Sequence, residues 1–323
     1  MTGEQWRECP ACGAAVERFL PMRSRRPDAV CPGCGALERH RFLAVLLEGL
    51  SPHVDTARTV VEVAPSPQTE AVLRRLPAGA YVRIDLDPAA DRRSVDVQAS
   101  VTALPFLDRS VDLAVCFHVL EHVPDDRAAM RELARVLSPG GLALVQVPWR
   151  PGHLTDEDPS AGVEERLARF GQADHVRYYG HDFEDRLRDE GVHAVRLVPA
   201  DVLGPRLLRL WGLIPNEAVW LCRPAGASSA DSDEAPYGGA AGALASRISG
   251  SLRLGLADQA LAGAVHRAQV MSDERDETRR ALARAEKEAA HWQQAYERLA
   301  AAPPVRAMLL VTRPVRRWLA RRP

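Results

Sequence analysis

The sequence predicts an α/β fold, with a mostly parallel sheet between layers of helices, and three observations lead to this prediction. A strand pattern at residues 111–117 is followed by an amphipathic helix at about 126–137, a Pro-Gly-Gly turn and a second strand at 142–147. Residues 59–63 form a short apolar run of β-branched side chains, which is typical of a buried strand. Finally, 323 residues, 46% of them hydrophobic, suffice to bury one full domain and to carry attachments.

Further elements complete this sheet. A helix is expected at residues 39–50, before the first strand, and another at 181–190. Additional strands are expected at residues 81–85, 192–198 and 219–222, in a mostly parallel sheet with an antiparallel edge. In a doubly wound sheet of this kind, ligands bind at the carboxyl ends of the strands.

Composition narrows the classes of function. The net charge of −1 argues against a protein that binds nucleic acid through its overall charge. No apolar run reaches the roughly 18–20 residues needed to span a bilayer, and the N-terminus lacks the charged-then-apolar layout of a secretory signal. We therefore expect a cytoplasmic protein, in which the six cysteines stay reduced and serve as metal ligands or core residues.

Four cysteines form two CxxCG motifs, Cys9 with Cys12 and Cys31 with Cys34, with 18 residues between the motifs. This spacing is typical of zinc sites, since the two-residue gap lets both thiolates of a motif face one ion. Four ligands close a tetrahedron, so the zinc would be structural. A redox-active CxxC pair is the alternative, but it does not explain two matched motifs. A zinc ribbon is therefore expected at residues 1–40.

Several segments together resemble one family. The stretch from Leu104-Pro105-Phe106 to Gly140-Gly141 resembles the second half of class I S-adenosylmethionine (SAM)-dependent methyltransferases, in the broad group that methylates small molecules. The segments LERHR at 37–41, HVLEH at 118–122 and FGQADHVRYYG at 170–180 resemble bacterial methyltransferases that begin with a CPxCG pair. The resemblance runs from about residue 9 to residue 224. It implies a Rossmann-like seven-stranded sheet and a SAM cofactor.

The resemblance also implies a cofactor loop after the first strand. Glu62 holds the acidic position that precedes this loop in most relatives. Ala64 and Ser66 stand where glycines are usual, and glycines there let the backbone approach the cofactor closely. The loop is therefore expected to bind SAM in an altered form.

Four more residues are implied as SAM contacts. Asp85 ends the second strand and would accept hydrogen bonds from the ribose hydroxyls, with Asp87 as the alternative and a simple turn as the structural interpretation. Ser100 stands where relatives carry an adenine-binding aspartate, and the amide of Val101 would assist it. Phe117 ends the strand that faces the methyl group in the family.

Two histidines follow that strand. His118 is a candidate general base near neutral pH, and His122 a candidate substrate contact, although structural roles in the loop are equally expected. The same residues spell the H-x-x-E-H motif of a zinc-peptidase class. That interpretation requires a long helix around the motif, which Pro124 and the preceding strand argue against.

A polar insertion after Pro148 is expected to cover the active site as a substrate lid. Within it, His175 would take a proton from a hydroxyl group. Asp174 and Arg177 would contact the substrate, the arginine through a carboxylate or phosphate. A purely structural role in the lid is an equal alternative.

The C-terminal third differs in composition. Residues 41–224 are assigned to the methyltransferase domain, 225–245 to a flexible linker, 246–300 to a helix or coiled coil that could self-associate, and 301–323 to a basic amphipathic tail. The tail contains six arginines and no acidic residue, which suits an anionic membrane surface. A position at the inner face of the membrane is one expectation, and a disordered tail is the other.

These features favour an enzyme that methylates an oxygen, with nitrogen and carbon as less favoured acceptors, of a small molecule or of a sugar-containing intermediate of a surface glycan or secondary metabolite. The competing hypothesis is a non-catalytic scaffold that recruits glycan-assembly enzymes. A nucleic-acid methyltransferase is disfavoured by the neutral charge.

Overall fold

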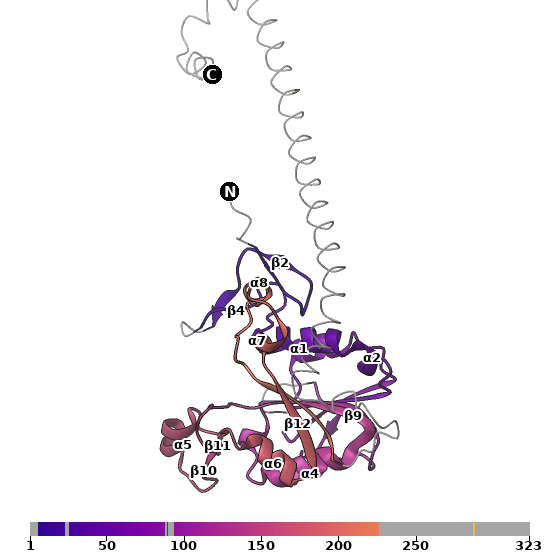
Figure 1. Ribbon diagram of the computed structural model, residues 1–323, viewed down its shortest axis with the longest axis vertical. Coiled ribbons are helices and arrows are strands. Elements are labelled where there is room, and N and C mark those ends of the chain that lie inside the picture. Colours follow the sequence, from indigo (N-terminus) through magenta and orange to yellow (C-terminus); the bar gives the residue numbers. More distant parts are fainter. Residues whose placement is uncertain (1–5, 23–25, 88, 90–93, 226–286, 288–323) are drawn as a thin grey trace, which may run out of the picture. The chain divides into compact units, whose positions relative to one another are not determined.

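The computed structural model describes residues 6–22, 26–87, 89, 94–225 and 287 (Figure 1). At its centre lies a seven-stranded sheet with the order β12-β13-β9-β8-β5-β6-β7. Its strands are β5 (Thr59–Val63), β6 (Ala80–Asp85), β7 (Val97–Gln98), β8 (Val111–Phe117), β9 (Leu137–Gln146), β12 (Val192–Leu197) and β13 (Val219–Pro224). The predicted α/β sheet is thereby confirmed.

The antiparallel pairings lie at one edge of the sheet, as the sequence analysis expected. β13 pairs antiparallel with β9 on one side and with β12 on the other, so β12 forms the edge. The four pairings among β9, β8, β5, β6 and β7 are all parallel. The apolar pattern of a strand marks it as buried but does not specify its neighbours, since pairing depends on which backbone edge is open.

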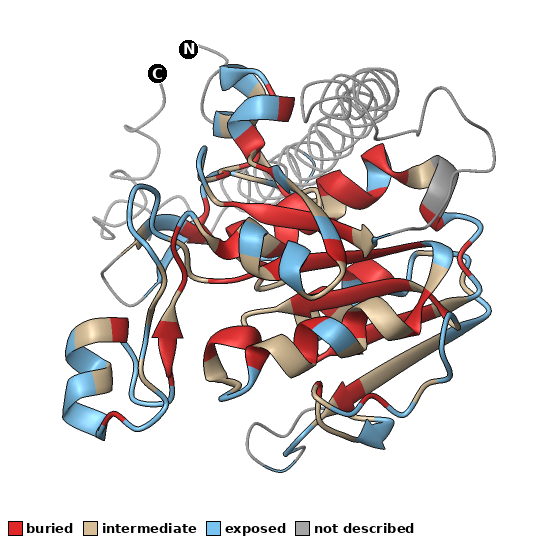
Figure 2. Ribbon diagram, turned by 60° about the horizontal axis from the view of Figure 1, so that its bottom comes forward, coloured by how far each residue is buried: buried red, intermediate tan, exposed pale blue. Residues whose placement is uncertain are grey.

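The strands of the sheet are largely buried (Figure 2), and their side chains alternate between two cores, one on each face of the sheet. Val60 points into the core that α1 (Glu38–Gly49), α2 (Ser51–Val54) and α3 (Pro67–Leu73) cover, and the next residue, Val61, points into the other. The second core is covered by α4 (Asp126–Val136) and α6 (Phe183–Asp189). This alternation is the period of two that a strand imposes on its side chains.

The N-terminal segment consists of two small hairpins, formed by β1 (Arg7–Glu8), β2 (Ala15–Val16), β3 (Leu20–Met22) and β4 (Arg26–Val30). Its Cys9 and Phe19 belong to the same core as α1. The fully buried guanidinium of Arg41 links the N-terminal segment to the sheet domain. It donates hydrogen bonds to the carbonyls of Ala29 and Ala36 and to that of Trp211, which lies between β12 and β13. The N-terminal segment is therefore packed onto the sheet domain.

The insertion after β9 contains β10 (Asp156–Glu157), α5 (Val163–Phe170) and β11 (Arg177–Tyr178), and β10 pairs with β11. Two short helices, α7 (Pro199–Val202) and α8 (Pro205–Leu210), connect β12 to β13. No helix in the described ranges is both long and apolar enough to cross a membrane. The expected linker, coiled coil and basic tail lie outside the described residues, apart from Lys287 and the first linker residue.

Candidate functional site

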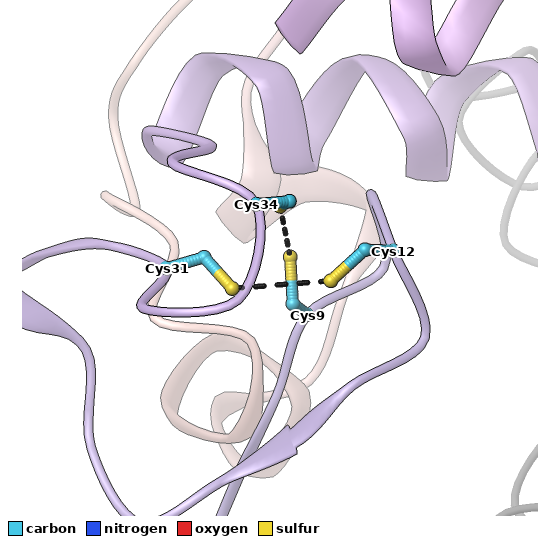
Figure 3. Close-up of side chains that lie close together, drawn as sticks. All are labelled: Cys9, Cys12, Cys31 and Cys34. Atoms are coloured by element: carbon cyan, nitrogen blue, oxygen red, sulfur yellow. Dashed lines mark hydrogen bonds between the residues drawn. The ribbon is translucent and has the colours of Figure 1, made fainter.

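The four predicted metal ligands converge on one point (Figure 3). Cys9 and Cys12 lie on the loop after β1, and Cys31 and Cys34 on the loop between β4 and α1. The Sγ atoms of Cys9 and Cys34 are 3.8 Å apart and those of Cys12 and Cys31 are 3.9 Å apart. A tetrahedron with metal–sulfur bonds of about 2.3 Å has edges of about 3.8 Å. The four thiols therefore have the separation that one metal ion requires.

A small cavity of about 130 Å³ opens at the carboxyl ends of β5 and β8. It is lined by four of the residues that the sequence analysis assigned to SAM, and by one predicted catalytic residue, namely Glu62, Ala64, Ser66, Phe117 and His118. Its volume is below the roughly 300–1,000 Å³ of a complete small-molecule site, so it would hold only part of a nucleoside cofactor.

Two residues of this cavity have left-handed backbones. Ala64 follows β5 with φ of 54°, and His118 follows β8 with φ of 55°. Glycine adopts this conformation without strain, whereas other residues do so at a cost of about 1–2 kcal/mol. Alanine therefore keeps the glycine-like backbone of the cofactor loop, and strain is concentrated where two neighbouring strands end.

Glu62 is buried and holds the predicted cofactor loop after β5 through a hydrogen bond to its backbone. It accepts hydrogen bonds from the backbone N–H of Ser66, at 3.0 Å, and from the hydroxyl of Tyr81. Burial raises the pKa of Glu62 from 4.5 to about 7, although these hydrogen bonds favour the charged form. Ser66 in turn caps α3 by accepting a bond from the N–H of Thr69 at 3.1 Å.

Arg39 and His40, at the start of α1, form the opposite wall of the cavity. Arg39 is half-buried, and no ion pair or hydrogen bond of its guanidinium is present within the described part of the chain. Burial lowers the pKa of Arg39, and the carboxylate of Glu217 partly offsets this. Burial also lowers the pKa of His40 to about 3, so this ring is neutral. Sequence reasoning missed both residues because it treated LERHR only as a family marker.

The remaining predicted SAM contacts lie beside this cavity and not in it. Asp85 is half-buried at the end of β6, and its Oδ1 accepts a hydrogen bond from the N–H of Asp87 at 3.0 Å. The hydroxyl of Ser100 lies 2.8 Å from that of Thr102 and accepts a bond from the Thr102 N–H. Val101 is buried. These residues follow β6 and β7, next to β5 in the sheet, along the edge where an extended ligand would continue.

His118 and Glu121 form a dyad directly after β8. The Nδ1 atom of His118 lies 3.0 Å from Oε1 of Glu121, and the carboxylate is fully buried while the histidine side chain is 34% exposed. A buried carboxylate on Nδ1 favours a proton there and leaves Nε2 as the basic atom. The predicted base is thus accessible and is held by a partner that the sequence analysis did not identify as such.

The insertion brings His175 and Asp174 to the same loop. The rings of His122 and His175 meet edge to face, with centroids 4.7 Å apart, and Nδ1 of His122 lies 3.2 Å from Oδ2 of Asp174. His175 is only 3% exposed, and burial lowers its pKa. Glu121, His122 and His175 therefore form a compact cluster in which His175 has little access to solvent.

Arg177 has a different environment from the one expected. It is 1% exposed, and its guanidinium donates hydrogen bonds to the carbonyls of Leu120, at 2.7 Å, and Pro124, at 2.8 Å. It also pairs with Glu157 at 3.1 Å. This environment leaves no surface for a substrate anion, so the residue fixes the insertion to the loop after β8. Sequence patterns did not distinguish these roles because both need a charged side chain.

Comparisons with known proteins match part of the chain to methyltransferases. Residues 33–145 match the model of a family described as "Methyltransferase domain". The chain is 39% identical over 148 residues to an uncharacterized methyltransferase of Mycobacterium sp. (strain JLS), covering 43% of this chain and 58% of that protein. It is 35% identical over 126 residues to a probable S-adenosylmethionine-dependent methyltransferase of Mycobacterium tuberculosis, covering 36% of this chain and 46% of that protein.

The matched part is thus about half the length of these curated relatives. Among solved structures, a complex of the Haloferax volcanii Trm112 methyltransferase activator with a putative methyltransferase aligns with a TM-score of 0.37 and 17% identity. That alignment covers 58% of this chain and 93% of the other.

Proposed function

This chain carries a class I SAM-dependent methyltransferase domain, and on that premise we propose that it transfers a methyl group from SAM to an oxygen atom of a small molecule. The observation that carries this proposal is the pairing of a cavity at the ends of β5 and β8 with an accessible histidine on its rim. When bound, SAM supplies a methyl group on a positively charged sulfur, which a substrate oxygen accepts with loss of its proton.

The residues of the cavity fit the amino-acid end of SAM. Arg39 offers a cation without an ion-pair partner among the described residues, which suits the carboxylate. Glu62 offers a buried carboxylate on the opposite wall, which suits the ammonium group. Ala64 adopts the left-handed backbone conformation that a glycine would adopt at this position. Since the cavity is small, we propose that the nucleoside extends toward Asp85, Ser100 and Val101 at the ends of β6 and β7.

His118 is our candidate for the residue that accepts the hydroxyl proton. Glu121 holds its Nδ1 atom, which leaves Nε2 as the basic atom, and both Phe117 and His118 line the cavity. This base adds to the alignment of the two reactants, which supplies most of the rate in such transfers. His122 and Asp174 lie next to it and are proposed to contact the acceptor.

We further propose that Cys9, Cys12, Cys31 and Cys34 hold a structural zinc ion. The sulfur separations and the convergence of all four thiols on one point support this. Because Cys9 and Cys31 belong to the core that contains α1, zinc would also fix the helix that carries Arg39.

The substrate class follows from the sequence rather than from the geometry, and we propose a sugar-containing intermediate. Calorimetric titration with SAM and with S-adenosylhomocysteine, followed by a methylation screen over hydroxylated glycans and nucleotide sugars, tests the proposal. Micromolar SAM binding and methyl transfer to a hydroxyl are expected. Failure to bind either ligand would instead favour the scaffold hypothesis.

A further inference from the structure

We propose that Glu121, His122 and His175 form a binding site for one divalent transition-metal ion, distinct from the four-cysteine site. One potential ligand atom from each residue lies within 4.8 Å of those of the other two. Two imidazole nitrogens and one carboxylate oxygen are a ligand set that zinc, iron, cobalt and nickel accept.

The two segments that supply these ligands are held together independently of any ion. The N–H of Val176 donates a hydrogen bond to the carbonyl of Glu121 at 2.9 Å. Arg177, fully buried, donates hydrogen bonds to the carbonyl of Leu120, the first residue of the η1 turn (Leu120–His122), and to that of Pro124, two residues after the turn. These contacts fix His175 beside Glu121 and His122. A site whose ligands are positioned by rigid backbone contacts is preorganised for its ligand.

Two atoms of the cluster are buried without a hydrogen-bond partner in the described part of the chain. They are Oε2 of Glu121 and Nδ1 of His175. Oε1 of Glu121 is already engaged by His118, so the second oxygen is left to another partner. Buried polar atoms are nearly always satisfied, and an orphaned pair of acceptors at one point indicates a missing donor or cation.

The second nitrogen of His122 has an oxygen partner, as the second nitrogen of a metal-bound histidine usually has. Nδ1 of His122 lies 3.2 Å from the carboxylate of Asp174. An outer oxygen of this kind fixes the tautomer and turns the other nitrogen's lone pair toward the metal.

The ion would have open coordination positions, because three protein ligands do not fill a tetrahedral or octahedral shell. The His122 side chain is 33% exposed, so the site is accessible from solvent. Resting on the proposed function, we infer that the ion binds an acceptor oxygen next to His118 and polarises it as a Lewis acid. The substrate class would then be one with an oxygen that can coordinate a metal.

Cobalt titration of the full-length protein, loaded beforehand with a single equivalent of zinc for the four-thiolate site and then freed of excess zinc, tests the site. With zinc in the cysteine site, the wild type should bind one additional Co²⁺, with a spectrum that lacks thiolate charge-transfer bands. His122→Asn and Glu121→Gln should each abolish this additional binding. Asp174→Asn should weaken it by about 10- to 100-fold, as expected for an outer partner of a ligand. His153→Asn, which changes an exposed histidine outside the cluster, is the matched control and should bind as the wild type does.

The proposal is overturned if the wild type binds no Co²⁺ beyond the cysteine site, or if His122→Asn binds it with unchanged affinity. His122 is partly exposed, so this variant decides the matter even if Glu121→Gln does not fold. A parallel SAM titration separates the two proposals. Cobalt binding by a protein that does not bind SAM would leave the metal site standing and remove the methyltransferase function.

Discussion

Replacing Arg39 by glutamine should weaken the binding of SAM and of S-adenosylhomocysteine, but not of 5′-methylthioadenosine. The first two ligands carry the amino-acid carboxylate that we assign to the small cavity, and the third lacks it. Arg39 lines that cavity from α1, whereas the adenosine would contact the ends of β6 and β7. The three ligands therefore isolate the interaction of one guanidinium with one carboxylate.

The magnitude follows from the environment of the arginine. An exposed ion pair contributes only about 0–1 kcal/mol because water screens it. Arg39 is half-buried, and the charge is not neutralised by an ion pair with any described residue. A charge-assisted hydrogen bond in such surroundings contributes about 1.5–3 kcal/mol. The dissociation constants of SAM and S-adenosylhomocysteine should therefore increase by about 10- to 150-fold.

Isothermal titration calorimetry at one salt concentration measures all three ligands on each variant. Arg58→Gln is the matched control, since it removes an exposed arginine just before β5, at the amino end of the same sheet. It should leave all three affinities unchanged. Unaltered SAM binding by Arg39→Gln would refute the assignment. An equal loss for all three ligands would also refute it, because the variant would then have damaged the whole site.

Three further changes test the surrounding structure. Glu62→Gln should raise the free energy of unfolding at about pH 8 by up to about 3 kcal/mol, since a pKa raised from 4.5 to about 7 makes the buried charge costly. The free energy of unfolding of the wild type should fall by this amount as the pH rises from about 4.5 to 7, whereas that of the variant should not. If urea unfolding gives the same pH dependence of this free energy for both proteins, the prediction is wrong. Arg41→Met should lower the free energy of unfolding by about 3–5 kcal/mol in the same assay, because it leaves buried carbonyls without a hydrogen-bond donor. A decrease below about 1 kcal/mol would show that these carbonyls find other donors. Removal of the metal with a chelator should increase amide hydrogen exchange in α1 as well as in the N-terminal hairpins, because Cys9 shares a core with Phe42. An increase confined to the hairpins would mean that they fold independently of α1.

Much of the sheet was predictable because its signals are local. The β-branched run at 59–63 and the strand at 111–117 have the bounds expected from their apolar patterns, and the helix predicted to end at residue 137 ends at Val136. The convergence of the four thiols was also predictable, since CxxC spacing encodes its own geometry. The position of β13 between β9 and β12 was not, because an apolar pattern does not specify which strand is the neighbour.

The candidate site shows the same division. Glu62 and Ala64, which the resemblance implied, and His118, which follows a strand, line one cavity because the ends of neighbouring strands converge in a parallel sheet. Arg39 was missed because its role depends on α1 packing across the cavity mouth. Arg177 was assigned to a ligand because its charge suggests exposure, yet its guanidinium is enclosed by backbone carbonyls.

The sequence by itself determined the class of fold, the four-cysteine cluster and the strand ends where a cofactor would bind, because spacing along the chain sets all three. Only the tertiary structure decided which charged side chains are buried in hydrogen bonds to other segments and which remain accessible to a ligand. Burial and hydrogen-bond partners come from segments far apart in the chain, as the meeting of His175 with Glu121 and His122 demonstrates. These long-range contacts control charge and access, and through them the chemistry of the site.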